Sequence, residues 1–195
     1  RPDPDSPQLS KAEARALARK TWREIRQNQP EILDRITSHW RNFARRPRFR
    51  TGRVLIYLPL RDEIDILATL HDRDPAAVFA PCTLADHRME FRQFAPASGR
   101  AIPGFQNVPG PAPDAPLLEL PLREGDLVVV PALAANPDGF RLGRGGGYYD
   151  RWRDRLAPAE TVALLPKSLA NLGFSGESHD LCFNCIITED AHFRT

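Results

Sequence analysis

The sequence predicts an α/β fold in three layers, with helices on both faces of a mostly parallel sheet. Short apolar runs that end at proline, such as Val54 to Leu58 and Leu127 to Val130, are typical of strands buried on both faces. From residue 54 onward such runs alternate with segments of helical spacing, which indicates parallel strands joined by helices. The expected architecture is therefore Rossmann-like, with extra helices at its N-terminus.

The domain organisation follows from length and local composition. Residues 1–9 hold three prolines and predict a flexible N-terminal arm. Residues 10–195 contain no internal repeat and no clear boundary, so we expect a single α/β domain there. A chain of 195 residues is long enough to bury a core without disulfides or a structural metal.

Two helices are expected before the first strand. Ser10 stands three residues before Glu13, which is the spacing of a capping box, so a helix should begin there. It should run to about Gln27, because Pro30 cannot continue it. The apolar residues of a second helix recur at three- and four-residue steps: Leu33, Ile36, Trp40 and Phe43.

The first half of the sheet is expected to start with the strand Val54 to Leu58, followed by helical spacing from Ile64 to His71. Ala76 to Ala80 predicts a second strand, and the alternating residues Met89 to Phe94 predict a third with one face buried. Prolines and glycines dominate from Pro96 to Pro116, so we expect a long ordered loop or flap there.

The second half of the sheet is expected to contain the central strand Leu127 to Val130. Tyr148 to Leu156 predicts a helix, and Thr161 to Leu165 and Cys185 to Thr188 predict the last strands.

Composition excludes some classes of protein. No apolar run approaches the roughly 18 to 20 residues of a membrane span, and the first residues lack the apolar core of a signal peptide. Three cysteines are an odd number, which argues against a secreted disulfide framework. The lone Cys182-x-x-Cys185 has no second pair and does not support a zinc site. We expect a cytoplasmic protein with reduced thiols and no membrane partner.

The stretch RLGRGGGYYDRW, residues 141–152, is the most unusual local feature. Glycine costs about 1 kcal/mol relative to alanine within a helix, so four glycines within residues 143–147 need a compensating role. The stretch follows a predicted central strand and precedes a predicted helix, which is where ligands bind in open α/β sheets. Exposed backbone N–H groups, a helix N-terminus, Arg141 and Arg144 together favour a phosphate chain.

Neither familiar nucleotide motif is present. The sequence contains no G-x-x-x-x-G-K-[ST], and G-x-G-x-x-G fails because Tyr148 occupies the last glycine position. A glycine-rich turn without a ligand remains the alternative interpretation for such a cluster. The flanking arginines and Asp150 favour the phosphate loop over that alternative.

The stretch DLVVVPALAANPDGFRLGRGGGYYDR, residues 126–151, resembles the signature of the 5-formyltetrahydrofolate cyclo-ligase family, also called methenyltetrahydrofolate synthetases. Shorter pieces extend the resemblance. Lys11 and Arg15 lie four residues apart on one helical face, YLPLRDEID spans residues 57–65, and SHD spans residues 178–180. The resemblance therefore covers the chain from about residue 11 to residue 190.

This resemblance implies an enzyme that uses ATP and Mg²⁺ to convert 5-formyltetrahydrofolate to 5,10-methenyltetrahydrofolate, with release of ADP and phosphate. Phosphorylation of the formyl oxygen creates a leaving group, which lets the neighbouring N10 close the ring. Catalysis then depends on positioning two substrates and neutralising phosphate charge.

The resemblance also assigns site residues. Asp150 and Asp180 would hold Mg²⁺, which prefers carboxylates, phosphate and water. Arg144 and Tyr148 would be catalytic. The folate would contact Leu58, Glu63, Arg144 and Tyr148, with Glu63 on the amino-pterin edge. The ATP would be bound by Lys11, Arg15, Arg141, Leu142, Gly143, Arg144, Gly145, Gly146, Gly147, Tyr148 and Tyr149.

One departure bears on affinity. Many relatives have lysine where this chain has Gly146, so one phosphate-facing cation is missing and Arg144 would have to replace it. The proline-rich residues 96–116 could form a flap on the folate side.

Two alternatives stay open. The folate comes from resemblance alone, so an ATP-using ligase with another substrate is one of them. From a different class, the arginines between Arg41 and Arg53 interleave with Phe43 and Phe49, which suggests an RNA-binding surface. We prefer the interpretation of this segment as a solvated helix end, and expect no nucleic-acid partner. We expect a monomer whose partner is 5-formyltetrahydrofolate, with or without a polyglutamate tail.

Overall fold

The central sheet has seven strands in the order β11-β10-β9-β6-β1-β2-β3 in the computed structural model, which describes residues 8–60, 63–97 and 99–195. Its parallel strands are β10 (Cys185–Ile187), β9 (Glu160–Leu164), β6 (Leu127–Val129), β1 (Val54–Leu55) and β2 (Val78–Thr83). β3 (Met89–Gln93) and β11 (His192–Arg194) add antiparallel strands at the two edges. The predicted mostly parallel sheet is confirmed.

The chain builds this sheet in two directions from β1. It passes from β1 to β2 and β3 on one side, then returns to β6 on the other side of β1 and continues to β9 and β10. The direction therefore switches between β1 and β6. Ligands of open α/β sheets bind outside the carboxyl ends of the strands at such a point.

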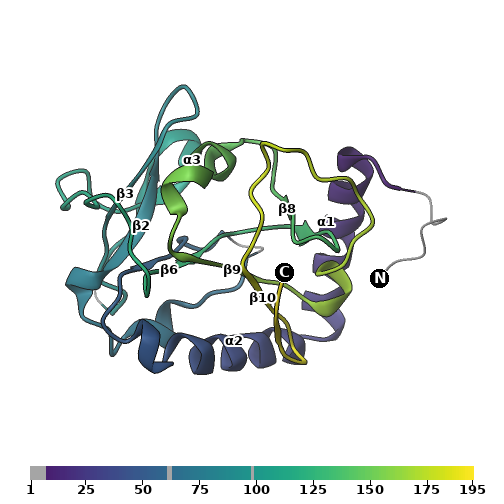
Figure 1. Ribbon diagram of the computed structural model, residues 1–195, viewed down its shortest axis with the longest axis horizontal. Coiled ribbons are helices and arrows are strands. Elements are labelled where there is room, and N and C mark those ends of the chain that lie inside the picture. Colours follow the sequence, from purple (N-terminus) through teal and green to yellow (C-terminus); the bar gives the residue numbers. More distant parts are fainter. Residues whose placement is uncertain (1–7, 61–62, 98) are drawn as a thin grey trace.

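The helices begin and end close to the predicted residues. α1 (Lys11–Asn28) has the predicted capping box, in which the Ser10 hydroxyl accepts from the Glu13 N–H and the Glu13 carboxylate accepts from the Ser10 N–H. α2 spans Glu31–Ala44 and α3 spans Tyr148–Leu156. Figure 1 shows α2 on one side of the sheet and α3 on the other, which confirms helices on both faces.

Buried indole groups fix the helices in place. In α1, Trp22 donates from Nε1 to the Leu133 carbonyl at 3.0 Å, just beyond the end of β6. Trp152 of α3 donates from Nε1 to the Met89 carbonyl in β3 at 2.7 Å. Each of these bonds satisfies the polar atom of a large buried side chain and fixes a helix to the sheet region that carries the site.

The segment after β1 differs from the prediction. The strand ends at Leu55, three residues early, and the expected α-helix from Ile64 to His71 is only a 3₁₀ turn, Leu67–Leu70. The Asp65 carboxylate accepts from the Leu67 N–H at 2.9 Å, and the Thr69 hydroxyl donates to the Ile66 carbonyl at 2.6 Å. Such local side-chain bonds compete with the α-helical ladder.

Other strand boundaries also differ. The second strand was expected over Ala76 to Ala80, but Pro75–Ala77 form a 3₁₀ turn capped by Asp74, and β2 begins at Val78. The proline-rich segment is mostly loop, as predicted, with one short ladder between β4 (Ile102–Pro103) and β5 (Pro109–Gly110).

Two elements had no clear sequence signal. One is the hairpin of β7 (Ala134–Ala135) and β8 (Arg141–Leu142), and the other is β11. Both are short and lack the apolar alternation that identifies longer strands.

The N-terminal arm stays a prediction, because residues 1–7 lie outside the described part of the chain. Leu9, the last residue of the predicted arm, donates from its N–H to the Gly173 carbonyl at 2.8 Å. None of the three cysteines forms a disulfide. Within the described residues, no helix combines the length and apolar character needed to cross a membrane.

Candidate active site

The glycine loop, residues 143–147, lies between two cavities of different character. The polar cavity, about 520 Å³, is lined mainly by charged side chains from α1, α3 and residues 179–180, and by glycine-loop backbone. The apolar cavity, about 330 Å³, is lined by residues that follow β1 and β6, by the β2–β3 hairpin and by Tyr148 and Tyr149. Arg141 and Gly147 line both cavities. The apolar cavity therefore lies at the switch point of the sheet.

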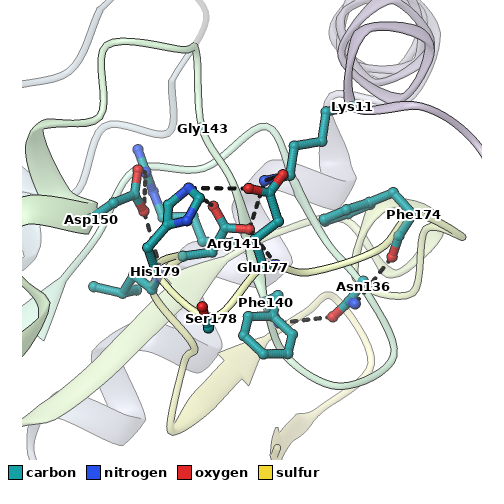
Figure 2. A network of polar contacts seen from close by, with 12 residues as sticks. Lys11, Asn136, Phe140, Arg141, Gly143, Asp150, Phe174, Glu177, Ser178 and His179 are labelled. Atoms are coloured by element: carbon teal, nitrogen blue, oxygen red, sulfur yellow. Dashed lines mark hydrogen bonds and ion pairs between the residues drawn. The ribbon is translucent and has the colours of Figure 1, made fainter.

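The β7–β8 hairpin explains how Arg141 reaches this position. Its turn is the sequence NPDG, in which the Asn136 side chain accepts from the Phe140 N–H at 2.8 Å, and Gly139 takes a φ of +83°. Asn136 also donates to the Phe174 carbonyl at 3.1 Å (Figure 2). These bonds satisfy the buried Asn136 side chain and direct the following strand toward the glycine loop.

Local geometry accounts for several of the glycines. Gly145 and Gly147 have φ values of +109° and +67°, which side-chain-bearing residues rarely adopt. A Cβ on Gly143 would lie 2.5 Å from the Arg141 guanidinium. The glycines are thus needed both for the turn of the loop and for the close approach of the Arg141 guanidinium.

Arg141 is the buried cation between the two cavities. Its Nε donates to the Pro131 carbonyl at 2.9 Å, its Nη1 lies 3.4 Å from both carboxylate oxygens of Asp150, and its guanidinium stacks 5.2 Å from the centre of the Tyr149 ring. Burial lowers the pKa of Arg141, and the nearby Asp150 carboxylate opposes that shift.

The polar cavity receives two cations from the first turns of α1. Arg15 donates from Nε to the Gly143 carbonyl at 3.0 Å, and Lys11 lies one turn earlier. The Lys11 ammonium is 2.7 Å from Asp180 Oδ2 and 2.7 Å from Glu177 Oε1. Figure 2 shows Lys11, Glu177 and His179 converging beside Arg141 and Asp150.

Asp150 and Asp180, the two predicted metal ligands, both line the polar cavity. Asp150 Oδ1 accepts from the N–H of Leu181 at 3.2 Å, so α3 is tied to the residue next to Asp180. Burial acts to raise the pKa of Asp180, but hydrogen bonds from Lys11 and from the Glu177 N–H outweigh it, and the pKa is lowered.

These two carboxylates fit Mg²⁺ by donor type, since Mg²⁺ binds one or two carboxylates together with phosphate oxygens and water. Within the described part of the chain, no group of three or more His, Cys, Asp or Glu side chains is placed to hold a metal ion. A metal here would therefore depend on oxygens from its ligand and from water.

The apolar cavity brings together all four predicted substrate residues: Leu58, Glu63, Arg144 and Tyr148. Glu63 accepts from the Leu60 N–H at 2.9 Å and lies 3.3 Å from Arg144 Nε. The proline-rich segment contributes Gln106, Val108 and Pro109 to the wall, in line with a flap on this side. Arg61 and Asp62 of the YLPLRDEID stretch lie outside the described residues.

The predicted ATP residues divide between the cavities. The polar cavity is lined by Lys11, Arg15, Arg141, Leu142, Gly143, Gly145 and Gly147. The apolar cavity is lined by Arg144, Gly146, Tyr148 and Tyr149, and also by Arg141 and Gly147. The residues of the single predicted ATP set thus lie on both faces of one loop.

Several residues at or beside the two cavities were missed by sequence reasoning. Tyr57 and Pro131 stand directly beyond the ends of the adjacent strands β1 and β6, a position that could have identified them. His87 lies at the tip of the β2–β3 hairpin, and its Nδ1 is 2.9 Å from the Gly146 carbonyl. Glu177 contacts Lys11 from a loop far away in sequence. Neither of these last two carries a sequence signal.

The basic segment between Arg41 and Arg53 is largely engaged in contacts within the protein. Arg45 pairs with Asp72 at 2.7 Å, and Arg53 pairs with the buried Asp126 at 2.6 Å. Arg48 stacks 4.3 Å from the centre of the Phe49 ring. These contacts, made by arginines that are mostly exposed, favour the interpretation of this segment as a solvated helix end and loop over an RNA-binding surface.

Comparison with known proteins connects this geometry to a family. A model of the 5-formyltetrahydrofolate cyclo-ligase family matches residues 9–170. A protein of Mycolicibacterium smegmatis described as 5-formyltetrahydrofolate cyclo-ligase is 36% identical over 68 residues, and that match spans 34% of this chain and 35% of the relative.

Two solved structures share the fold. One is the Aquifex aeolicus 5,10-methenyltetrahydrofolate synthetase, with a TM-score of 0.73 and 20% identity, matched over 95% of this chain and 93% of that one. The other is a 5,10-methenyltetrahydrofolate synthetase from Mycoplasma pneumoniae, with a TM-score of 0.69 and 17% identity, matched over 93% of this chain and 99% of that one. Because the family model covers most of the sequence, this chain belongs to the 5-formyltetrahydrofolate cyclo-ligase family.

Proposed function

We propose that this chain converts 5-formyltetrahydrofolate and ATP to 5,10-methenyltetrahydrofolate, ADP and phosphate, with Mg²⁺ as the metal. One observation carries the proposal beyond family membership. A cavity of cations and carboxylates and a cavity of apolar and aromatic side chains share Arg141 and Gly147 as a common wall. A phosphoryl transfer between two unlike substrates needs such a boundary, where the γ-phosphate of one substrate meets an oxygen of the other.

The polar cavity is the proposed ATP site. Lys11 and Arg15 supply charge for the phosphates, and the glycine loop leads into α3, whose N-terminal N–H groups favour anions. Asp150 and Asp180 are the proposed Mg²⁺ ligands. When bound, the metal neutralises negative charge on the phosphates.

The apolar cavity is the proposed folate site. Its volume and aromatic lining suit a flat pterin ring. The Glu63 carboxylate would accept hydrogen bonds from the N–H groups of the amino-pterin edge, while Leu58 and Tyr148 flank the ring.

The protein's contribution to the reaction is mainly positional. The formyl oxygen attacks the γ-phosphorus and ADP leaves, then N10 attacks the formyl carbon and loses its proton, and phosphate leaves. Arg141, at the boundary between the cavities, and Arg144, on the folate side, would neutralise charge on the transferred group. We also propose that the enzyme is cytoplasmic and monomeric and that it accepts polyglutamylated folate. These three proposals rest on composition and on the family resemblance.

The test is a change in absorbance at the methenyl-folate band after mixing the protein with 5-formyltetrahydrofolate and MgATP. A rise that requires ATP would establish the reaction. If no rise occurs but calorimetry still detects MgATP binding, the chain is an ATP-using enzyme with another substrate.

A further inference from the structure

Tyr149 carries a buried hydroxyl that has no hydrogen-bond partner among the described residues. The residue is 6% exposed, and it lines the apolar cavity from the first turn of α3. Another buried tyrosine of the same wall, Tyr57, donates from its hydroxyl to the Ile64 carbonyl at 2.7 Å. The protein therefore satisfies the hydroxyl of one tyrosine in this wall and, within the described residues, leaves the other without a partner.

Packing holds the ring of Tyr149 in this position. The Arg141 guanidinium lies 5.2 Å from the centre of the ring, and the Phe91 ring meets it edge-on, with the two ring centres 6.4 Å apart. Arg141 is itself held by the Pro131 carbonyl and by the Asp150 carboxylate. Turning the ring to bring its hydroxyl to bulk water would break these contacts, so the hydroxyl stays in the wall.

The hydroxyl costs stability where it stands. Phenylalanine would fill the same space without burying an unpartnered polar group. Burial raises the pKa of Tyr149, and the charge of Glu63 also raises it, while Arg141 opposes the shift. The phenol therefore keeps its proton at neutral pH and can donate a hydrogen bond. A group that destabilises the fold and remains able to donate indicates an acceptor supplied by a ligand.

The ligand of the apolar cavity is the source of that acceptor. Glu63 lines the same cavity and is close enough to act on the pKa of Tyr149, which indicates that the hydroxyl lies on the cavity side of the ring. The oxygen is shielded from solvent in this structure, so a small movement of the wall must accompany the bond. Hydrogen bonds of active sites often tighten only when the substrate binds.

We infer that the Tyr149 hydroxyl donates a hydrogen bond to a carbonyl oxygen of the reduced folate in the apolar cavity. 5-Formyltetrahydrofolate carries one such oxygen on its pterin ring and one on its formyl group. In a pterin the ring carbonyl stands next to the N–H groups from which Glu63 would accept, so a donor close to Glu63 is well placed for it. The inference rests on the proposed folate site, and it assigns to the folate a residue that the resemblance assigned to ATP.

Calorimetric titration of Tyr149→Phe with two folates tests this bond. 5-Formyltetrahydrofolate should bind roughly tenfold more weakly than it binds wild type, because a carbonyl loses its donor. Tetrahydrofolate, which lacks the formyl group, identifies the oxygen: an equal loss for both ligands assigns the bond to the ring carbonyl, and a loss for 5-formyltetrahydrofolate alone assigns it to the formyl oxygen. MgATP should bind equally to both proteins, since the variant keeps the ring that stacks on Arg141.

A second readout separates a hydroxyl that binds the ligand from one that acts only on the fold. In urea without ligand, Tyr149→Phe should be more stable than wild type, and a fixed concentration of 5-formyltetrahydrofolate should stabilise wild type more than the variant. The matched variant is Tyr57→Phe, which loses a hydroxyl of the same wall that already has a partner. It should be less stable than wild type, and its affinity for 5-formyltetrahydrofolate should change by less than about twofold.

The outcomes distinguish this inference from the proposed function. Unchanged affinity of Tyr149→Phe for 5-formyltetrahydrofolate would overturn the inference and leave the proposed folate site intact. A weaker affinity for MgATP alone would also overturn it and would place Tyr149 with the nucleotide. Equal losses of folate affinity in Tyr149→Phe and Tyr57→Phe would indicate a general disturbance of the wall and reject a specific bond. Wild type that binds no 5-formyltetrahydrofolate would reject the proposed folate site itself.

Discussion

The two cavities differ in how the protein satisfies their own polar groups. In the polar cavity, cations and carboxylates pair with each other, as in Lys11–Asp180 and Arg141–Asp150. In the wall of the apolar cavity, the buried Tyr149 hydroxyl has no hydrogen-bond partner among the described residues. A ligand in the polar cavity therefore meets charged groups that already pair with each other. The apolar cavity also holds an ion pair, Glu63–Arg144, but it offers mainly shape and aromatic surface, and among the described residues the Tyr149 hydroxyl in its wall is left unsatisfied.

The largest expected effect comes from a substitution in the polar cavity. Asp150→Asn should lower kcat/KM by on the order of 10²- to 10³-fold, because it removes half of the proposed metal pair. The fold should survive, since the amide oxygen can still accept from the Leu181 N–H. Calorimetry should show unchanged binding of 5-formyltetrahydrofolate. Full activity in this variant would remove Asp150 from the metal site.

Arg15→Ala should raise the KM for ATP about tenfold and leave the KM for 5-formyltetrahydrofolate unchanged. The guanidinium donates to the Gly143 carbonyl on the polar face of the loop, so its loss should affect that side alone. Arg19→Ala, one turn further along α1 at an exposed position, is the matched control. If only the KM for 5-formyltetrahydrofolate changed, α1 would have to bind the folate and not ATP.

A pair of tyrosine variants tests the apolar side through stability. Tyr149→Phe should raise the free energy of unfolding by about 1 kcal/mol, because it removes a buried hydroxyl that has no partner in the described residues. Tyr57→Phe should lower it by about 1 kcal/mol, because the buried Tyr57 hydroxyl donates to the Ile64 carbonyl at 2.7 Å. Urea unfolding measures both free energies. Equal changes in the two variants would contradict the difference between a hydroxyl with a partner and one without.

The smallest effect is expected at the hairpin tip that touches the loop from the apolar side. Asp86 and His87 both have positive φ, and His87 Nδ1 contacts the Gly146 carbonyl. His87→Gly keeps the backbone conformation but removes the donor, so the KM of both substrates should rise about two- to threefold.

His87→Asn is the rescue variant for this contact. Asparagine tolerates positive φ and retains a short N–H donor, so it should restore wild-type KM values. Equal kinetics for the glycine variant and wild type would show that the contact does not position the loop.

Local signals in the sequence located much of the site. The capping box placed the start of α1, and with it the one-turn spacing of Lys11 and Arg15. The glycine cluster between a central strand and a helix identified the loop, and α3 has the predicted bounds Tyr148–Leu156. These features depend on neighbouring residues, which a sequence displays directly.

Features that depend on distant contacts could not be predicted in this way. Lys11 meets Asp180 across 169 positions of sequence, and no local pattern shows that Glu177 would share the same ammonium. The 3₁₀ turn Leu67–Leu70 replaced an expected α-helix because side chains of Asp65 and Thr69 bond the local backbone. The division of one glycine motif between two cavities required the three-dimensional path of the loop.

The most direct test of two substrates on opposite faces of one loop is a crystal structure with a non-hydrolysable ATP analogue, Mg²⁺ and 5-formyltetrahydrofolate. We predict the triphosphate in the polar cavity against Lys11 and Asp180, and the pterin in the apolar cavity against Glu63 and Tyr148. The γ-phosphate and the formyl oxygen should meet beside Arg141. Both ligands in one cavity, or the nucleotide on the Tyr148 side of the loop, would contradict this arrangement.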